Sequence, residues 1–286
     1  MGIILAVLSS LLLGISNVLL KKSFKDFPPS ISFFIASAFS ILIWVPVGLL
    51  FGVEFNQWLL GSFVGLVSAI LGQALYIYVL EKGEISITAT ILASFSIYTI
   101  LFSMIFNRER PTLLTLFFIA LTIIGTIIVS LPEEINKKEL KKVNFIFWAV
   151  GAAIGIGASD TLTKYYINQA SVGSFLFYVS FAQILVSLIY LKFDKQPLNQ
   201  LNEIFHRFKE YTFALLGSLF IIVATMFLFL SFNFTLASIA SPIAASSPIV
   251  TIVLALIFLK EKISLKNWMG LIIVFVSIIS IGFLAG

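Results

Sequence analysis

Long apolar stretches dominate this chain, and short polar or turn-rich segments separate them. They are much longer than the roughly ten-residue alternating strands of a membrane β-barrel, so they predict helices. Each is close to the about 17–25 residues that a helix needs to cross about 30 Å of hydrocarbon. We therefore predict an all-α integral membrane protein with ten transmembrane helices. Their predicted ranges are 3–20, 31–51, 57–80, 85–106, 112–131, 145–167, 171–191, 212–232, 234–259 and 267–285.

Three boundaries need separate arguments. Residues 213–259 carry no charge and are too many for one spanning helix, so we place a turn near residues 233–238. Residues 132–143 are rich in Glu and Lys and are expected to form a solvated linker. Residues 192–211 have apolar side chains at three- and four-residue steps, which favours a helix in the membrane interface; a plain loop is the alternative.

The second half of the chain repeats the first. At a shift of 152 residues, the fourth predicted span and its exit align with the ninth, and at a shift of 143 residues 14–21 align with residues 157–164. Each half has five predicted spans, an odd number, so the second half enters the membrane from the opposite side. The expected architecture is two inverted five-helix repeats, residues 2–131 and 144–286.

Composition supports this class and excludes others. Hydrophobic residues make up 60% of the chain, charged residues only 11%, and the mean hydropathy is +1.11. An average globular protein has about 25% charged residues. The lack of cysteine and the single histidine exclude thiolate nucleophiles and multi-histidine metal sites. The formal charge of +5 comes mostly from lysines between spans, so no nucleic-acid partner is expected.

Asp160 and Lys164 are the only opposite charges within one predicted span. Because they are four residues apart, they share one face of a helix. A charged side chain in hydrocarbon is costly and usually faces a bundle interior or a wet cavity. Asp160 is therefore predicted to carry a proton or to pair with a cationic substrate. The alternative is a structural pair with Lys164, whose ammonium could also extend to the interface.

Other polar residues in the spans are candidates for a substrate site. The amides in apolar helices could bind a ligand or join two helices, and a hydroxyl stripe in the fourth span, matched in the ninth, suits a cavity wall or close helix packing. Tyrosines could add an aromatic surface for a cation. The predicted substrate-binding residues are Asn17, Gln73, Tyr76, Ser94, Tyr98, Asp160, Lys164, Gln183 and Ser246, with Asp160 also predicted for proton coupling.

Two motifs resemble the EamA-type branch of the drug/metabolite transporter superfamily. Residues 106–111, and their repeat at 258–264, are similar to the "L-x-E-x-(L/I)-(S/T)" signature of that branch, and residues 14–17 resemble the "G-S-N" turn of its first helix. The signature glutamates are Glu109 and Glu261, and their basic neighbours predict interfacial salt bridges. The resemblance implies a ten-helix metabolite transporter whose cavity is lined mainly by the first, third, fourth, sixth, eighth and ninth helices.

We therefore expect a secondary transporter, not an enzyme. It would move a small metabolite, such as an amino acid or amine, through a central cavity, without a cofactor or bound metal. The lipid bilayer of the plasma membrane is the expected surrounding, and the protein could be a monomer or a homodimer. A lipid or amphiphile flippase, and a membrane enzyme or assembly partner without transport, are the alternatives.

The distribution of basic residues predicts the orientation. Fifteen of the 18 lysines and arginines lie in loops after odd-numbered spans. The positive-inside rule places these loops in the cytoplasm and both termini outside. The family resemblance implies termini inside, so the two arguments disagree.

Overall fold

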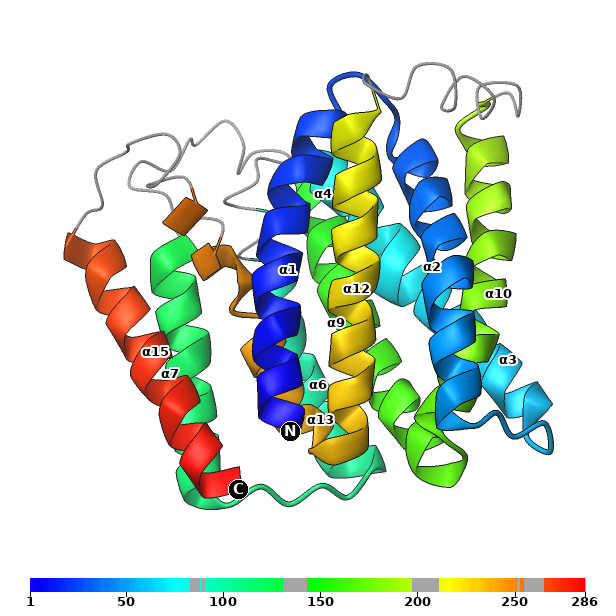
Figure 1. The fold of residues 1–286 in the computed structure, drawn as a ribbon. Helices are drawn as coiled ribbons and strands as arrows, with labels where there is room; N and C mark the ends of the chain where they lie inside the picture. Colours follow the sequence, from blue (N-terminus) through cyan, green and yellow to red (C-terminus); the bar gives the residue numbers. More distant parts are fainter. Residues whose placement is uncertain are drawn as a thin grey trace.

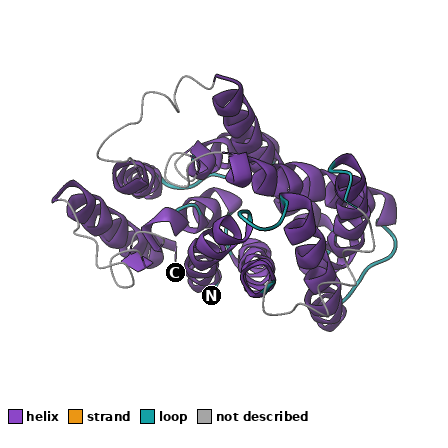
Figure 2. Ribbon diagram, turned by 90° about the horizontal axis from the view of Figure 1, so that it is seen from above, coloured by secondary structure: helices purple, strands orange, loops and turns teal. Residues whose placement is uncertain are grey.

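The computed structural model describes most of the chain. The residues that it describes are 1–82, 88, 91–130, 143–196, 211–250, 253–254 and 265–285. Within these ranges every regular element is a helix, as Figure 2 shows. Three predictions lie wholly or largely outside the described residues: the charged linker, the interfacial helix and the contacts of Glu261.

The helices follow the predicted apolar stretches (Figure 1). In chain order they are α1 (Gly2–Ser23), α2 (Pro29–Phe51), α3 (Trp58–Val67), the π-helix η1 (Ser68–Ala74), α4 (Leu75–Lys82), α6 (Phe95–Phe106), α7 (Leu113–Ser130), α9 (Val143–Gln169), α10 (Val172–Phe193), α12 (Thr212–Phe234), α13 (Ala237–Ala244) and α15 (Leu265–Ala285).

Helices long and apolar enough to cross a membrane confirm the membrane-protein class. Among the described residues, six helical stretches meet this requirement: Gly2–Ser23, Pro29–Phe51, Trp58–Lys82, Ile146–Gln169, Val172–Phe193 and Thr212–Phe234. Shorter apolar helices occupy parts of the other predicted spans: Ile91–Phe106, Leu113–Ile128, Ala237–Val250 and Trp268–Leu284. The total of ten spans stays a prediction. The predicted turn near residues 233–238 is confirmed, because α12 ends at Phe234 and α13 begins at Ala237.

The second helices of the two halves, α2 and α10, pack against each other in opposite directions. Ser37 Oγ donates a hydrogen bond to Ser187 Oγ (2.9 Å), and Ser180 Oγ donates to the carbonyl of Ser40 (3.4 Å). The numbers rise along α2 as they fall along α10, and Figure 1 shows the same antiparallel pair. Matched helices of the two halves therefore run in opposite directions here, as an inverted repeat requires.

The first helices of the two halves also run in opposite directions. Ser16 Oγ, late in α1, donates to the carbonyl of Gly217, early in α12 (2.8 Å), so α1 and α12 are antiparallel. Lys164, late in α9, reaches the carbonyl of Phe232, late in α12, so α9 and α12 are parallel. It follows that α1 and α9 are antiparallel. Both chain termini lie at the same end of the bundle (Figure 1).

The predicted fourth and ninth spans are each interrupted, at matched positions. Ser94 lies in a turn before α6, and Ser246 lies in a turn after α13. Each serine hydroxyl donates to the carbonyl three residues earlier, Ser94 to Ile91 and Ser246 to Ile243, at 2.6 Å in both cases. The expected hydroxyl stripe of the fourth span lies partly outside the described residues, so it stays a prediction. Local side chain–backbone bonds of this kind compete with helical hydrogen bonding and favour such breaks.

Candidate functional site

A small cavity lies where helices of both halves meet, and we call it the Asp160 cavity. Its volume is about 60 Å³, space for roughly two water molecules. It is bounded by α1, η1, α4, α6, α9 and α12, which belong to the first, third, fourth, sixth and eighth predicted spans. Its lining residues are Leu13, Ser68, Gly72, Gln73, Tyr76, Phe95, Ile156, Ser159, Asp160, Ile221, Thr225, Leu228 and Phe229.

The carboxylate of Asp160 joins α9 to both interrupted helices. Its side chain is only 3% exposed. Oδ2 accepts a hydrogen bond from Ser241 Oγ of α13 (2.7 Å) and one from Thr99 Oγ1 of α6 (3.3 Å). Asp160 does not form an ion pair with Lys164 in the described structure, so the alternative of a structural pair is wrong. The carboxylate is positioned by hydroxyl groups from two other helices.

The ammonium of Lys164 holds the C-terminal end of α12. Nζ donates to the carbonyls of Phe232 (2.5 Å) and Thr235 (3.1 Å). The last carbonyls of a helix lack intrahelical partners and form the negative end of the helix dipole, so a cation is favourable there. Lys164 is 8% exposed and does not line the Asp160 cavity. Its extension to the membrane interface stays an untested alternative, and its role as a substrate ligand stays a prediction without support from this geometry.

Lys21 makes the matching contact in the first half. Its Nζ donates to the carbonyls of Leu80 and Glu81, both at 2.9 Å, at the end of α4. The repeat shifts of 143 and 152 residues convert Lys21 into Lys164 and Leu80 into Phe232. The same lysine contact is thus present at both ends of the bundle, once per half.

Two glycines of the repeated motif make a second matched contact. A β-carbon on Gly14 would lie 2.6 Å from Val250 Cβ and 2.7 Å from the carbonyl oxygen of Ser247. A β-carbon on Gly157 would lie 2.6 Å from Tyr98 Cβ and 3.0 Å from the carbonyl oxygen of Phe95. These are repeat-related contacts, and each joins the first helix of one half to the fourth helix of the other. Close backbone approach explains why glycine stands at both positions.

Gln73 is the cavity residue with the most unsatisfied hydrogen-bonding capacity. Its side chain is 4% exposed, and within the described structure neither Nε2 nor Oε1 has a partner. Ser68 Oγ, also on the cavity wall, is unpartnered in the same way. Both residues belong to η1, and π-helical turns inside α-helices occur frequently at functional sites.

Asn17, which the repeat aligns with Asp160, has a different role in the fold. Its Oδ1 accepts a hydrogen bond from the hydroxyl of Tyr76 (2.6 Å). Tyr76 lines the Asp160 cavity, whereas Asn17 is buried behind it. Asn17 thus positions Tyr76, and its direct contact with a substrate stays a prediction.

Four other predicted site residues lie away from the Asp160 cavity. Tyr98 packs its Cβ against Gly157, and Ser94 belongs to the helix break described above. Gln183 is fully buried in α10, and its amide has no partner within the described structure. Ser246 lines a different pocket. The structure therefore brings together Gln73, Tyr76 and Asp160 from the predicted set.

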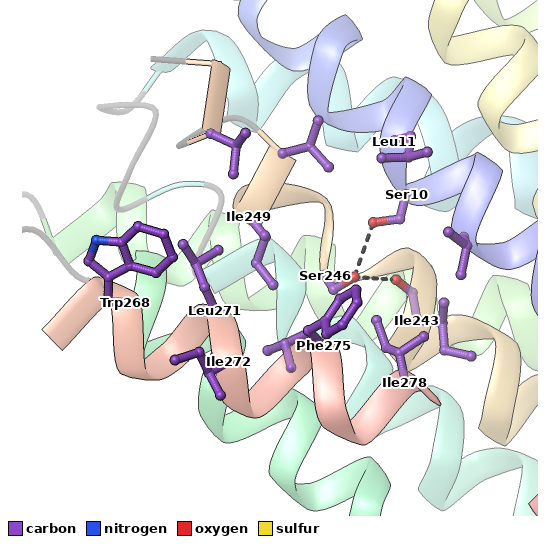
Figure 3. A pocket seen from close by; sticks show the side chains of 14 residues that line it. Ser10, Leu11, Ile243, Ser246, Ile249, Trp268, Leu271, Ile272, Phe275 and Ile278 are labelled. Carbon is purple, nitrogen blue, oxygen red and sulfur yellow. Dashed lines mark hydrogen bonds between the residues drawn. The ribbon is translucent and has the colours of Figure 1, made fainter. Parts of the chain in front are cut away.

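The pocket at Ser246 is larger and almost wholly apolar (Figure 3). Its volume is about 490 Å³, and its walls come from α1, α13, α15 and the residues that follow α13. Ser10 Oγ and Ser246 Oγ share a hydrogen bond (3.0 Å) at its inner side. Trp268 and Phe275 of α15 are 53% and 69% exposed. This pocket presents apolar side chains and hydroxyls that are already bonded.

Glu109 has a role that the sequence interpretation missed. Its carboxylate is 6% exposed and accepts from the backbone N–H of Ala237 (2.9 Å), the N–H of Ser238 (2.9 Å) and Ser238 Oγ (2.5 Å). It therefore caps the N-terminus of α13, where a negative charge is favourable. The predicted interfacial salt bridge of Glu109 is wrong within the described residues. Asp160 and Glu109 are thus both buried carboxylates.

The backbone after α6 directs Glu109 towards α13. Asn107 Nδ2 donates to the carbonyl of Thr161 on α9 (3.1 Å), and Arg108 adopts a left-handed conformation with φ of 54°. Glu109 N then donates back to the carbonyl of Ser103 (3.2 Å). The sequence signal for this cap was present, because Glu109 and Ser238 both belong to repeated motifs, but no local spacing connects them.

Comparisons with known proteins agree with this two-part architecture. The profile of the EamA-like transporter family matches residues 1–131 and again residues 144–283. A solved crystal structure superposes with a TM-score of 0.70 over 98% of this chain and 96% of the other, at 13% identity, which shows a shared fold alone. An uncharacterized protein of Methanocaldococcus jannaschii is 27% identical over 71 residues, 25% of this chain and about half (52%) of that protein. The double match over most of its length shows that this chain belongs to the EamA-like transporter family.

Proposed function

We propose that this protein is a secondary transporter that moves a small metabolite through the Asp160 cavity. The observation that carries the proposal is a buried carboxylate on a cavity wall built from helices of both halves. Membership of a transporter family supports the reaction class. A substrate site between inverted repeats is the usual arrangement in secondary transporters.

The geometry also supports a physical route for transport. At about 60 Å³, the Asp160 cavity is much smaller than the roughly 300–1,000 Å³ of ordinary ligand pockets, so the halves must move to admit a metabolite. The lysine contacts at opposite ends of the bundle hold helix ends in each half, which suits rocking of intact units. Asp160 accepts hydrogen bonds from α6 of the first half and α13 of the second half. A change in its charge or in its partner would therefore alter contacts with both halves.

Asp160 is proposed as the residue that pairs with the substrate or carries a coupling proton. Replacement Asp160→Asn keeps the shape and removes the charge. We expect at least a tenfold lower initial rate in proteoliposomes loaded with a panel of labelled amino acids and amines, which corresponds to about 1.4 kcal/mol or more. Any dependence of the rate on pH should also flatten.

The matched control is Asp26→Asn, because Asp26 is an exposed aspartate after α1. It should transport at the normal rate. Thermal unfolding in detergent should show that both variants fold. A normal rate and pH profile for Asp160→Asn would make this carboxylate structural and would remove the main support for the proposal.

We further propose a plasma-membrane location with both termini outside. The support is the fifteen-to-three distribution of basic residues. The termini lie at one end of the bundle (Figure 1), so one reporter tests both. A reporter active only in the cytoplasm, fused after Gly286, should give little signal. A strong signal from the full-length fusion would reverse the orientation.

A further inference from the structure

We propose that the Asp160 cavity selects substrates carrying a cationic amine, which pairs with Asp160, together with a neutral hydrogen-bonding group, which pairs with Gln73. Substrates whose only charge is a carboxylate are rejected. This inference rests on the proposed transport function and specifies its substrate class. The substrate class follows from which polar side chains of the cavity wall already have a hydrogen-bond or ion-pair partner within the protein and which do not.

When Asp160 is ionised, the cavity wall is negative. Among the described lining residues, Asp160 is the one acidic side chain and no basic residue is present. The two lysines of the repeated motif, Lys21 and Lys164, do not line the cavity; they donate hydrogen bonds to backbone carbonyls at helix ends. A carboxylate entering this cavity would meet a like charge without a compensating cation, and that repulsion is weakly screened inside a protein.

The Asp160 carboxylate is placed for a cation that comes from outside the protein. Oδ2 is held by the hydroxyls of Ser241 and Thr99, which are neutral donors. A buried charge is normally paired, and the described structure provides no ion pair for it. An ammonium group would complete the pair.

The second recognition point is Gln73. A buried amide without partners is unfavourable, and an orphaned polar group in a folded protein needs an explanation such as a ligand or water. Both polar atoms of Gln73 are unpartnered, and Ser68 beside it on η1 is unpartnered too. An amide donates and accepts but has no charge, so its natural partner is a hydroxyl, carbonyl or amide of the substrate.

The chain itself contains a matched control for Gln73. Gln183 is also a buried glutamine whose amide has no partner within the described structure, but it lies in α10 away from the cavity wall. Replacement of either glutamine by leucine removes an unsatisfied buried amide, so the effects on folding should be similar. Only Gln73→Leu removes a group that faces the cavity.

Binding is tested on the purified full-length protein with three probes that share a phenylalkyl skeleton. Tyramine has an amine and a hydroxyl, phenethylamine has the amine alone, and 3-(4-hydroxyphenyl)propanoate has a carboxylate and a hydroxyl. Apparent dissociation constants come from the ligand-dependent rise in the thermal unfolding midpoint. Tyramine should bind most tightly, phenethylamine about tenfold more weakly, and the carboxylate not detectably.

The variants separate the two recognition points. Asp160→Asn should weaken both amines. Gln73→Leu should weaken tyramine about tenfold, to the level of phenethylamine, and leave phenethylamine unchanged. Gln183→Leu should change neither. Equal weakening by the two glutamine variants would overturn the role of Gln73.

Two other outcomes would overturn the substrate class. One is binding of the carboxylate as tightly as the amines, and the other is binding of none of the three probes. In either case, Asp160-dependent transport of a different metabolite in the proteoliposome panel would leave the proposed function standing. If the unmodified protein transported no metabolite of the panel, that result would instead contradict the proposed function itself.

Discussion

The two halves of this protein use related copies of one motif to build opposite ends of the bundle, and one of the positions at which the copies differ changes the chemistry. Lys21 and Lys164 make matching contacts with helix ends. Between the glycine and the lysine of each motif, Asn17 stands in the first half and Asp160 in the second. Asn17 supports Tyr76, whereas Asp160 faces the cavity and binds hydroxyls of two interrupted helices.

This difference separates architecture from chemistry. The glycine contacts are the same in both halves, so the interface between the halves contains two copies of one packing arrangement. Such contacts depend on close packing against a neighbouring backbone. They therefore form in the same way in both halves, although the halves are inverted in the membrane. A charge is costly in the membrane interior, and a single carboxylate gives the cavity an asymmetry that a perfectly repeated motif would lack.

The largest effect on this comparison should come from the matched glycines. Gly14→Val and Gly157→Val each place side-chain atoms against backbone of the opposite half, so each should lower the free energy of unfolding by about 3 kcal/mol. The control is Gly151→Val on α9, where a β-carbon meets nothing within 4 Å. Thermal unfolding in detergent measures all three. A loss confined to one of the matched glycines would show that the two interfaces are not equivalent.

The next effect tests the lysine contacts. Lys21→Met and Lys164→Met remove charge-assisted hydrogen bonds and leave carbonyls unsatisfied, so each should cost about 2 kcal/mol of stability. Lys25→Met, at an exposed position after α1, should be close to neutral. Unfolding midpoints of the three variants give the answer. If Lys164→Met were fully stable but unable to bind amines, the lysine would belong to the substrate site.

A smaller effect is expected at the cap of α13. Glu109→Gln keeps the shape of the side chain but removes the charge at the helix N-terminus, so stability should fall by about 1 kcal/mol. Glu81→Gln is the comparison, because within the described residues Glu81 forms an ion pair with the neighbouring, half-exposed Lys82 (2.9 Å), and such pairs contribute little. Equal midpoints for both variants would mean that the charge of Glu109 does not stabilise the cap.

The smallest effects should come from the serines at the matched helix breaks. Ser94→Ala removes one hydroxyl bond to the carbonyl three residues earlier, so it should cost about 0.5 kcal/mol. Ser246→Ala removes the matching bond and also the bond shared with Ser10, so it should cost more, about 1 kcal/mol. Neither should change the KM for transport, because neither serine lines the Asp160 cavity. A severalfold increase in KM for either variant would restore the original prediction that these serines bind substrate.

Much of the fold could be predicted because the bilayer restricts the choices. In hydrocarbon, every backbone polar group must be satisfied internally, so long apolar runs become helices. The turn between α12 and α13 followed from length alone, since residues 213–259 cannot form one span. The breaks at Ser94 and Ser246 were not predicted, because an apolar sequence with serines is equally compatible with a continuous helix.

The candidate site was predicted only in part. Gln73, Tyr76 and Asp160 do share one cavity, since polar residues in apolar helices tend to face the bundle interior. Gln183 satisfies the same argument but lies in another packing interface. Helical spacing places Lys164 on the face of Asp160, yet it cannot show that the end of α12 offers better partners for an ammonium.

The sequence by itself determined the class of protein, most of the helical stretches and the internal repeat, and it made Asp160 a candidate site residue. These follow from hydrophobicity, length and identity at fixed shifts, which are properties of the chain alone. Only the tertiary structure decided which groups are already satisfied: Glu109 and Lys164 by helix ends, Asp160 by two hydroxyls, and Gln73 by none within the described residues. The physical reason is that these partners lie far apart in sequence, so their contacts exist only after the helices pack.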